Sequence, residues 1–353
     1  MIPRHAWFLS LSLLTLTAAL ASAQTPWPRH VIDDTSRGAD GIRLADVNGD
    51  GRLDITTGWE QGGTVRVYLN PGPTQAKEKW PAVTVGQVGD VEDAVFADLD
   101  GDRAVDVVSC CEGKTRSMFV HWAPADRDRY LNERAWRTEA LPASAQAMMW
   151  MFALPLQMSS RHGLDLIAGG KGKNAAIGWF EAPAQARRLQ DWTWHPLRPC
   201  GWLMSLVAWD MDGDGDRDII FTDRKGKDSG AAWLENPGPG AAQAKPWREQ
   251  AIGGAGREVM FLELIDLDRD GLEDALIGVK PRKILWMRRL DGTGRAWERH
   301  AIPQPQNTGT AKAVNAADFD GDGRLDLVFS CESAEAPLHG LMWLSCDAPF
   351  AGG

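Results

Sequence analysis

Five short segments of this chain carry acidic side chains at a spacing that suits the binding of a metal ion. Each has oxygen-bearing side chains at its first, third, fifth and ninth positions. The candidate ligands are Asp46, Asn48, Asp50, Asp54, Asp98, Asp100, Asp102, Asp106, Asp210, Asp212, Asp214, Asp218, Asp266, Asp268, Asp270, Asp274, Asp318, Asp320, Asp322 and Asp326. Such groups repel one another within nine residues unless a cation lies among them. A hard cation that takes about six to eight oxygen ligands fits, so we expect Ca²⁺ at about five sites.

A sixth, degenerate unit lies between the second and third of these loops, where the spacing doubles. It ends at Asp165 and has Gln157, Ser159 and Arg161 at its first, third and fifth positions. The guanidinium of Arg161 could take the place of a cation and pair with Asp165, so we expect this loop to form without metal. The six units then repeat with a period of roughly 50–60 residues. Each loop takes the number of its unit, so the five acidic loops are the first, second, fourth, fifth and sixth.

Each unit predicts four short β-strands around its acidic loop. In the first unit, one runs into the loop at 41–45 and one leaves it at 53–57. A third carries an aromatic residue at 67–69, and a fourth follows Trp80. Short β-branched and apolar runs between Gly, Pro and Asp clusters are typical of strands. Four strands per unit, repeated six times, predict an all-β fold, a β-propeller of four-stranded blades.

The order of the strands also suggests how the ring closes. If the strand that enters each acidic loop is innermost, the chain begins with an outer strand at 30–33 and ends after the third strand of unit six. The N-terminal strand can then complete the last blade and leave no exposed sheet edge. Six blades are therefore expected, and seven with a missing C-terminal unit is the alternative.

The repeats resemble the FG-GAP/VCBS repeat family, which is found in integrin α-subunit propellers and in many secreted bacterial proteins. The Asp-x-Asp-x-Asp-Gly-x-x-Asp pattern carries this resemblance, which covers about residues 27–346. It implies a propeller with calcium between the first and second strands of its blades, and members include adhesion domains, binding modules and enzymes. The third unit lacks the ligands and the Phe-Gly and Gly-Ala-Pro flanks are poorly kept, which places the chain nearer the bacterial group.

The N-terminus predicts export. Residues 1–23 have a basic start at Arg4, an apolar run from Trp7 to Leu20 and an A-x-A cleavage pattern ending at Ala23. The run is too short for a confident membrane span, and no other stretch suits one. We therefore expect a signal peptide at 1–23, a single propeller domain at 24–353 and a secreted or periplasmic protein.

The net charge is mainly a property of the loops. The formal net charge is −10, and the five loops hold 21 of the 48 acidic residues. Bound calcium would nearly neutralise the chain, so the charge indicates no basic partner. Nucleic-acid binding needs a basic face and is not expected.

The cysteine and tryptophan residues are expected to be mainly structural. Of five cysteines, Cys331 and Cys346 are the candidates for a disulfide because they fall on neighbouring strands of one blade. Cys110 is expected in the core. Most of the seventeen Trp recur at two fixed positions of the repeat and should pack between blades, whereas Trp150 and Trp202 do not.

A propeller commonly binds its partner on one face around the channel. The residues expected at the start of the innermost strands, and so at the mouth, are Asp40, Glu92, Asp93, Met149, Trp150, Trp202, Arg257, Glu258 and Lys312. Indole faces beside charged groups are a common way to hold sugars and peptides. We therefore take Trp150, Trp202, Arg257 and Glu258 as candidate ligand-binding residues.

Two functions are compatible with these features. The first is a non-catalytic exported binding or adhesion module for a glycan or a protein. The alternative is a calcium-dependent carbohydrate-active enzyme such as a polysaccharide lyase, which needs a base, an acid and a cation. Glu92, Arg257, His121 and His195 are the candidate groups for it, but they form no motif, so whether the chain is an enzyme stays open.

Overall fold

The computed structural model describes residues 30–159, 161–238, 247–319, 323–332, 334 and 337–346, and these form six antiparallel sheets. The first contains β1 (Ala39–Ala45), β2 (Asp54–Trp59), β3 (Thr64–Tyr68) and β4 (Ala82–Gly86). The second contains β5 (Val91–Ala97), β6 (Asp106–Cys111), β7 (Met118–Trp122) and β8 (Arg137–Ala140). The third contains β9 (Met149–Leu156), β10 (Asp165–Lys171), β11 (Ala176–Glu181) and β12 (Thr193–Pro199).

The other three sheets follow in chain order. The fourth contains β13 (Leu203–Trp209), β14 (Asp218–Asp223), β15 (Gly230–Glu235) and β16 (Arg248–Gly253). The fifth contains β17 (Val259–Ile265), β18 (Asp274–Val279), β19 (Lys283–Arg289) and β20 (Trp297–Pro303). The sixth contains β21 (Thr310–Ala317), β22 (Asp326–Glu332) and β23 (Leu341–Leu344). Short 3-10 helices η1 (Arg127–Arg129), η2 (Glu133–Ala135), η3 (Pro142–Ser144) and η4 (Leu189–Asp191) lie in the connections.

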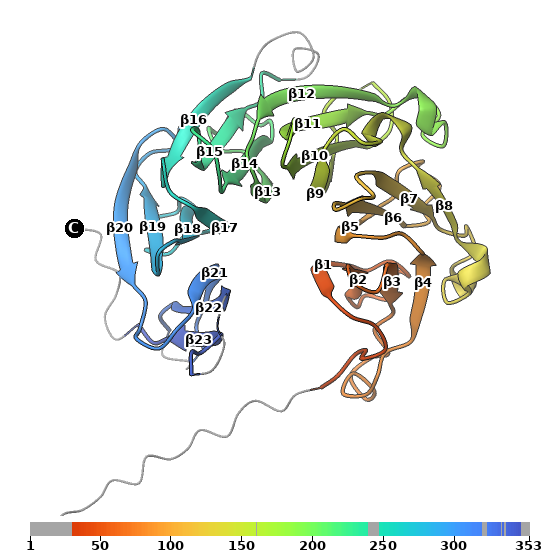
Figure 1. Ribbon diagram of the computed structural model, residues 1–353, viewed down its shortest axis with the longest axis horizontal. Coiled ribbons are helices and arrows are strands. Elements are labelled where there is room, and N and C mark those ends of the chain that lie inside the picture. Colours follow the sequence, from red (N-terminus) through yellow and green to blue (C-terminus); the bar gives the residue numbers. More distant parts are fainter. Residues whose placement is uncertain are drawn as a thin grey trace, which may run out of the picture.

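The sheets stand around a central axis, with β1, β5, β9, β13, β17 and β21 innermost (Figure 1). Each of these strands lies against the innermost strand of the next sheet, from β1 against β5 to β17 against β21. This confirms the predicted all-β propeller, its six units and the inner position of the strand that enters each acidic loop.

The core lies between the sheets, which explains the composition of the central strands. Every residue of β6, β14 and β18 is buried, because neighbouring sheets cover both faces of a blade. Such strands lose the alternation of apolar and polar residues and become continuous apolar runs. Trp179 and Trp233 in the third strands are fully buried, and so nearly are Trp136 and Trp192 before the fourth strands. Most of the recurring tryptophans are therefore core residues, as predicted, but Trp80 and Trp297 are half-buried and Trp343 is 38% exposed.

The expected closure of the ring is not found in the described structure. Residues 30–33 pair with the first sheet instead, where the Trp80 N–H donates to the Ile32 carbonyl at 3.3 Å. Arg66 Nη1 lies 2.5 Å from Asp33 Oδ2, and the Tyr68 hydroxyl donates to the same oxygen at 2.8 Å. These contacts to a carboxylate hold the segment beside the first sheet, and the sixth sheet has three strands within the described residues.

The ring is consequently open between β21–β23 and β1–β4 (Figure 1). Both flanking sheets have exposed apolar side chains: Ile42 is exposed by 66% and Leu44 by 56% on β1, and Leu341 by 73% on β23.

The suggested disulfide between Cys331 and Cys346 does not form. Strand β22 pairs with β23 in a register that puts Leu327 opposite Leu344 and Ser330 opposite Leu341. The Cys331 N–H therefore donates to the Gly340 carbonyl, whereas the Cys346 N–H donates to Asp326 at the other end of the strands. Cys331 is a free thiol, and Cys110 is a buried one, as predicted.

Candidate functional site

The acidic loops all lie at the end of the sheets where the innermost strands finish. In every unit the ninth loop residue is the first residue of the second strand, as at Asp54 in β2 and Asp218 in β14. Asp40 and Glu92 instead lie at the start of the innermost strands β1 and β5. Because a strand has two ends, the loops and the channel mouth occupy opposite faces of the propeller.

The first carboxylate of each loop shapes the turn around it. Asp46 Oδ1 accepts the Gly49 N–H at 2.8 Å, and Asp46 Oδ2 accepts the Gly51 N–H at 2.9 Å. Asp98, Asp210, Asp266 and Asp318 accept the equivalent N–H of the sixth loop residue. That sixth residue has a positive φ, 82° at Gly51, which favours glycine. Arg103 takes the same conformation in the second loop with a φ of 71°.

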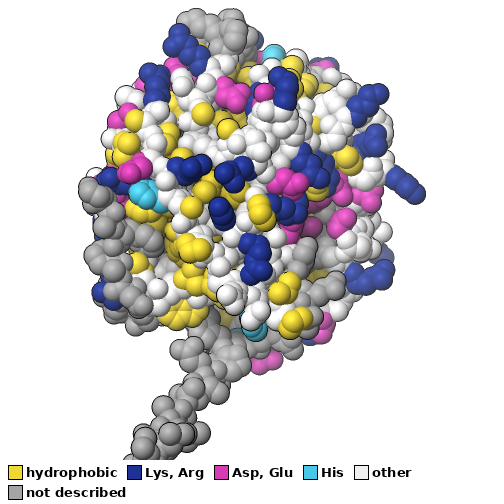
Figure 2. Space-filling model, turned by 60° about the vertical axis from the view of Figure 1, so that its left-hand side comes forward, with side chains coloured by type: hydrophobic (Ala, Val, Ile, Leu, Met, Phe, Trp, Pro, Cys, Tyr) yellow, Lys and Arg dark blue, Asp and Glu magenta, His cyan; other side chains and the backbone are white. Residues whose placement is uncertain are grey.

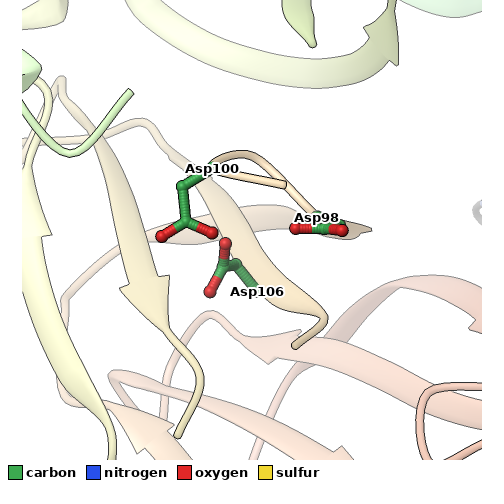
Figure 3. Close-up of side chains that lie close together, drawn as sticks. All are labelled: Asp98, Asp100 and Asp106. Carbon is green, nitrogen blue, oxygen red and sulfur yellow. The ribbon is translucent and has the colours of Figure 1, made fainter. Parts of the chain in front are cut away.

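Three loops bring carboxylate oxygens close together. One oxygen from each of three residues lies within 4.8 Å of the others in three groups: Asp98, Asp100 and Asp106 (Figure 3); Asp210, Asp212 and Asp218; and Asp266, Asp268 and Asp270. Asn48 and Asp50 are joined by a hydrogen bond of 3.0 Å in the first loop. Asp320 and Asp322 of the sixth loop lie outside the described residues.

The electrostatics of these groups suit a cation. Burial raises the pKa of the Asp106 carboxyl to about 8, and the like charge of Asp100 adds to this rise. Burial likewise raises the pKa of Asp218 to about 7. Asp212 Oδ1 and Asp268 Oδ1 are buried and accept no hydrogen bond, which costs free energy unless another group compensates. Clustered carboxylate oxygens are the ligand set that calcium prefers, so the residues fit this ion.

The ninth carboxylate has a second, structural role that the sequence did not reveal. Asp54 is fully buried; its Oδ2 accepts the Val47 N–H at 3.0 Å and its Oδ1 accepts the Asn70 N–H at 2.8 Å. It thereby ties the start of the acidic loop to the end of the third strand. The same pair of backbone bonds is made by Asp106, Asp165, Asp218, Asp274 and Asp326.

The third unit keeps the two backbone hydrogen bonds to the ninth carboxylate but not the candidate cation ligands. Asp165 accepts the N–H groups of Met158 and Ala182, both at 2.8 Å. We expected Arg161 to pair with Asp165, but Arg161 Nη1 lies 3.4 Å from Glu181 Oε1 and the side chain is 61% exposed. The reason is that the Asp165 oxygens already face the backbone N–H groups, so the guanidinium reaches the carboxylate at the end of β11.

A cavity of about 470 Å³ opens at the channel mouth. Five of the nine residues predicted at the mouth line it, namely Asp40, Glu92, Asp93, Trp202 and Lys312. Its lining includes the apolar side chains of Phe152, Met204 and Phe261, and Glu263 adds a carboxyl.

The four candidate ligand-binding residues do not form one group. Trp150 is fully buried, and its Nε1 donates to the Ser144 carbonyl at 2.9 Å, so it is a core residue and not a mouth residue. Arg257 is exposed in the turn before β17 and does not line the cavity. Glu258 lies outside the cavity lining and pairs with Arg224, with Nε and Oε2 3.1 Å apart.

Trp202 does line the cavity, but cations surround its ring. Lys171, Arg224 and Lys225 have their charged groups 4.7, 4.7 and 4.6 Å from the ring centroid. The indole therefore holds these side chains in place by cation–π attraction and offers little free face to a ligand.

A ring of charged residues at the mouth was missed by the sequence analysis. The sixth residue after each buried ninth-position aspartate is charged, and the six are Glu60, Glu112, Lys171, Arg224, Lys280 and Glu332. Several pair with one another across blades: Lys171 with Glu112, Arg224 with Glu332 at 3.1 Å, and Lys280 with Glu332. Their constant offset from the repeat was the signal that could have found them. Three acids and three bases make this ring electrically balanced.

The mouth also contains a carboxyl with a raised pKa, that of Glu92. Lys171 Nζ lies 2.9 Å from Glu92 Oε1 and pairs with Glu112 as well, so two carboxyls share one ammonium. Burial raises the pKa of Glu92 to about 7, and the hydrogen bond with Glu112 adds to this rise, while Lys171 opposes it.

Residues 46–109, 210–277 and 266–329 match the FG-GAP-like repeat. The matches cover more than half of the sequence, and the chain belongs to this family of repeat proteins. No curated protein matches the sequence. No helix among the described residues is long and apolar enough to cross a membrane.

Several solved structures are similar to this one. A lectin from Agrocybe aegerita that recognises non-reducing terminal N-acetylglucosamine has 15% identity and a TM-score of 0.44, over 88% of this chain and 81% of that chain. A chain from the complex of BBS1N with ARL6DN has 8% identity and a TM-score of 0.42, over 85% and 91%. The NanB sialidase from Streptococcus pneumoniae has 11% identity and a TM-score of 0.38, over 87% and 58%.

The structural role of the ninth carboxylate can be tested in the third unit, which lacks the other ligands. Asp165→Asn replaces one acceptor oxygen with an NH₂ group that faces backbone N–H donors. We expect the free energy of unfolding to fall by about 2–3 kcal/mol, the cost of losing a buried hydrogen bond to a charged group. Chemical denaturation should give the same loss in calcium and in chelator. A loss seen only in calcium would contradict the structural role.

The raised pKa of Glu92 predicts a pH dependence of stability. Between about pH 4.5 and pH 7 the unfolded carboxyl has lost its proton while the folded one keeps it, so stability falls as the pH rises. Glu92→Gln removes this fall, and the variant should gain up to about 3 kcal/mol over the wild type at pH 8 relative to pH 4. Urea denaturation of both proteins at the two pH values measures the difference. Parallel pH profiles would show that the pKa of Glu92 is not raised.

Proposed function

We propose that this protein is an exported calcium-binding β-propeller that acts as a non-catalytic binding module and holds a glycan at its channel mouth. The observation that carries the proposal is the cavity of about 470 Å³ at the mouth, a size typical of sites for small ligands. Membership of the FG-GAP-like repeat family agrees with a binding role. Export rests on the predicted signal peptide at residues 1–23, which lie outside the described residues.

The chemistry of the cavity favours a sugar. The six charges of the ring sum to zero and five of them pair with one another, so the ring carries no excess charge that would favour a charged ligand over a neutral polar one. Phe261, whose ring centroid lies 5.8 Å from Lys312 Nζ, offers an apolar surface beside a cation, and Asp40, Glu263 and Lys312 offer polar groups to hydroxyls. Burial raises the pKa values of Asp40 and Glu263, which suits carboxyls that exchange hydrogen bonds with hydroxyl groups. A protein ligand that inserts one polar side chain is the competing outcome.

Calcium would be held by the side chains at the first, third and fifth positions of the first, second, fourth, fifth and sixth loops. The buried carboxylate at the ninth position would lie next to these ligands. The ion would supply positive charge that neutralises the converging carboxylates. The chain's own contribution is the geometry: the backbone N–H groups orient the first carboxylate, and the buried ninth one fixes the loop to the sheet. Calcium in these loops would stabilise the face opposite the mouth.

The alternative of a polysaccharide lyase lacks an assembled set of groups. His121 is buried inside the second sheet between Ser109 and Thr138, and burial lowers its pKa to about 3. His195 stacks on Trp179 in the third sheet with 4.5 Å between ring centroids. Of the four candidates only Glu92 lines the cavity. An unsaturated, ultraviolet-absorbing product from a uronic-acid polymer would establish the alternative.

Metal content and melting temperature test the calcium proposal. With saturating calcium we expect about five ions per chain by mass spectrometry under native conditions. Chelation should lower the melting temperature by ten degrees or more, because several sites that bind only the folded state add their free energies (about 2.7 kcal/mol each at 100 times Kd). Magnesium at the same concentration is the control. No bound metal and no thermal shift would refute calcium binding.

Variants at the mouth test the ligand site. On a glycan array in calcium buffer, we expect the sugar that binds the wild type to bind Glu263→Gln and Lys312→Gln about tenfold more weakly, the loss of one hydrogen bond to a charged group. Glu298→Gln and Lys77→Gln make the same changes on exposed positions away from the cavity and should bind as the wild type does. Equal binding by all four variants would show that the ligand does not bind at the mouth. Binding to proteins but to no glycan would change the ligand class.

A further inference from the structure

We propose that the guanidinium groups of Arg187 and Arg288 act as built-in cations in the second and fifth acidic loops, so that the protein has two classes of calcium site. Calcium must displace an arginine in these two loops, whereas in the fourth loop no described basic side chain pairs with the carboxylates. The inference rests on the proposed calcium binding and assigns different affinities to individual loops.

The fifth loop shows the arrangement most directly. Arg288 at the end of β19 pairs through Nε with Asp268, and its Nη2 lies 3.3 Å from Asp270 Oδ2. One guanidinium therefore bridges the third and fifth ligand positions, as a bidentate cation would. The Asp268 side chain is only 4% exposed, and its Oδ1 is buried without a hydrogen-bond partner. The arginine thus satisfies one oxygen of this carboxylate and leaves the other one uncompensated.

The second loop has the same bridge from a different source. Arg187 comes from the third unit, between β11 and η4, and pairs through Nε with Asp100. Its Nη2 lies 3.3 Å from Asp102 Oδ2, so it also joins the third and fifth positions. The guanidinium carbon lies 4.7 Å from the ring centroid of Trp122. Trp122 occupies the third-strand position that Arg288 has in the fifth unit, so the indole supports the cation there.

The third unit contains the same contact with the charges exchanged. Glu181 lies at the position of the third strand that Arg288 has in the fifth unit. Arg161 is the fifth residue of its loop, as Asp270 is of its own. Their side chains pair at 3.4 Å, close to the 3.3 Å of Arg288 and Asp270. An ion pair between this strand position and the loop therefore recurs whether the strand supplies the base or the acid. This recurrence indicates a defined site for the cation and not a chance surface contact.

The fourth loop has the opposite composition. Glu235 stands at the same third-strand position, and within the described part of the chain no basic side chain pairs with a carboxylate of residues 210–218. This loop holds five aspartates, and Asp212 Oδ1 is buried without a partner. It consequently has the greatest need for an external cation. In the first loop Arg52 pairs with Asp50 only, without bridging to the third position.

Calcium titration of arginine variants tests the two classes. In the wild type, isothermal titration calorimetry of the chelator-treated protein should resolve two weak sites beside the tighter ones. Arg288→Gln and Arg187→Gln should each bind calcium about tenfold more tightly at one of these, because no ion pair has to be broken. The double variant should then show no weak class. Arg188→Gln removes a neighbouring exposed arginine that pairs with Asp191 and is the matched control.

Melting temperatures give a second readout that does not depend on resolving the sites. In chelator, Arg288→Gln and Arg187→Gln should melt several degrees below the wild type, since their carboxylates lose the internal cation. In saturating calcium this difference should disappear. A loss that is equal in chelator and in calcium, or a weak class unchanged by the variants, would overturn the inference while calcium binding stands. If the wild type binds no calcium, the inference fails together with the proposal on which it rests.

Discussion

A buried carboxylate at the start of every second strand is the interaction on which the rest of the structure depends. It accepts one backbone N–H from the acidic loop and one from the end of the third strand, as Asp54 does with Val47 and Asn70. The third unit has lost the outer ligands but keeps this contact at Asp165. The shape of the loop is therefore set by backbone hydrogen bonds to a carboxylate, and the proposed cation binding would be an addition to it.

The same carboxylate fixes the two faces of the propeller relative to each other. The loops lie directly before it, and the balanced ring of charges lies six residues after it, at the far end of the second strand. Acidic charge is thereby concentrated on one face, while the other face carries three acids on neighbouring units and three bases on the remaining units. On the side drawn in Figure 2, basic, acidic and apolar side chains are interspersed. A propeller built in this way can use one face for stability and the other for recognition.

Arginine, and calcium if it binds as proposed, would meet the same electrostatic need in different units of this chain. Carboxylates that converge within a few ångström need positive charge, and Arg288 supplies it from the same blade whereas Arg187 supplies it from the next one. A guanidinium is always present, but a calcium ion binds only when the surroundings provide it. The blades can therefore differ in how strongly their order depends on calcium, although their backbone geometry is the same.

The sequence by itself determined the repeat, the strand order and the positions of the acidic loops, because these depend on local spacing within one unit. It also placed most of the recurring tryptophans, such as Trp179, in the core. Only the tertiary structure decided which side chains meet across blades. Trp150 is buried, three cations surround Trp202, and residues 30–33 bind the first sheet instead of closing the ring. Such contacts join residues far apart in the chain, and their energies depend on register and burial, which no spacing along the sequence specifies.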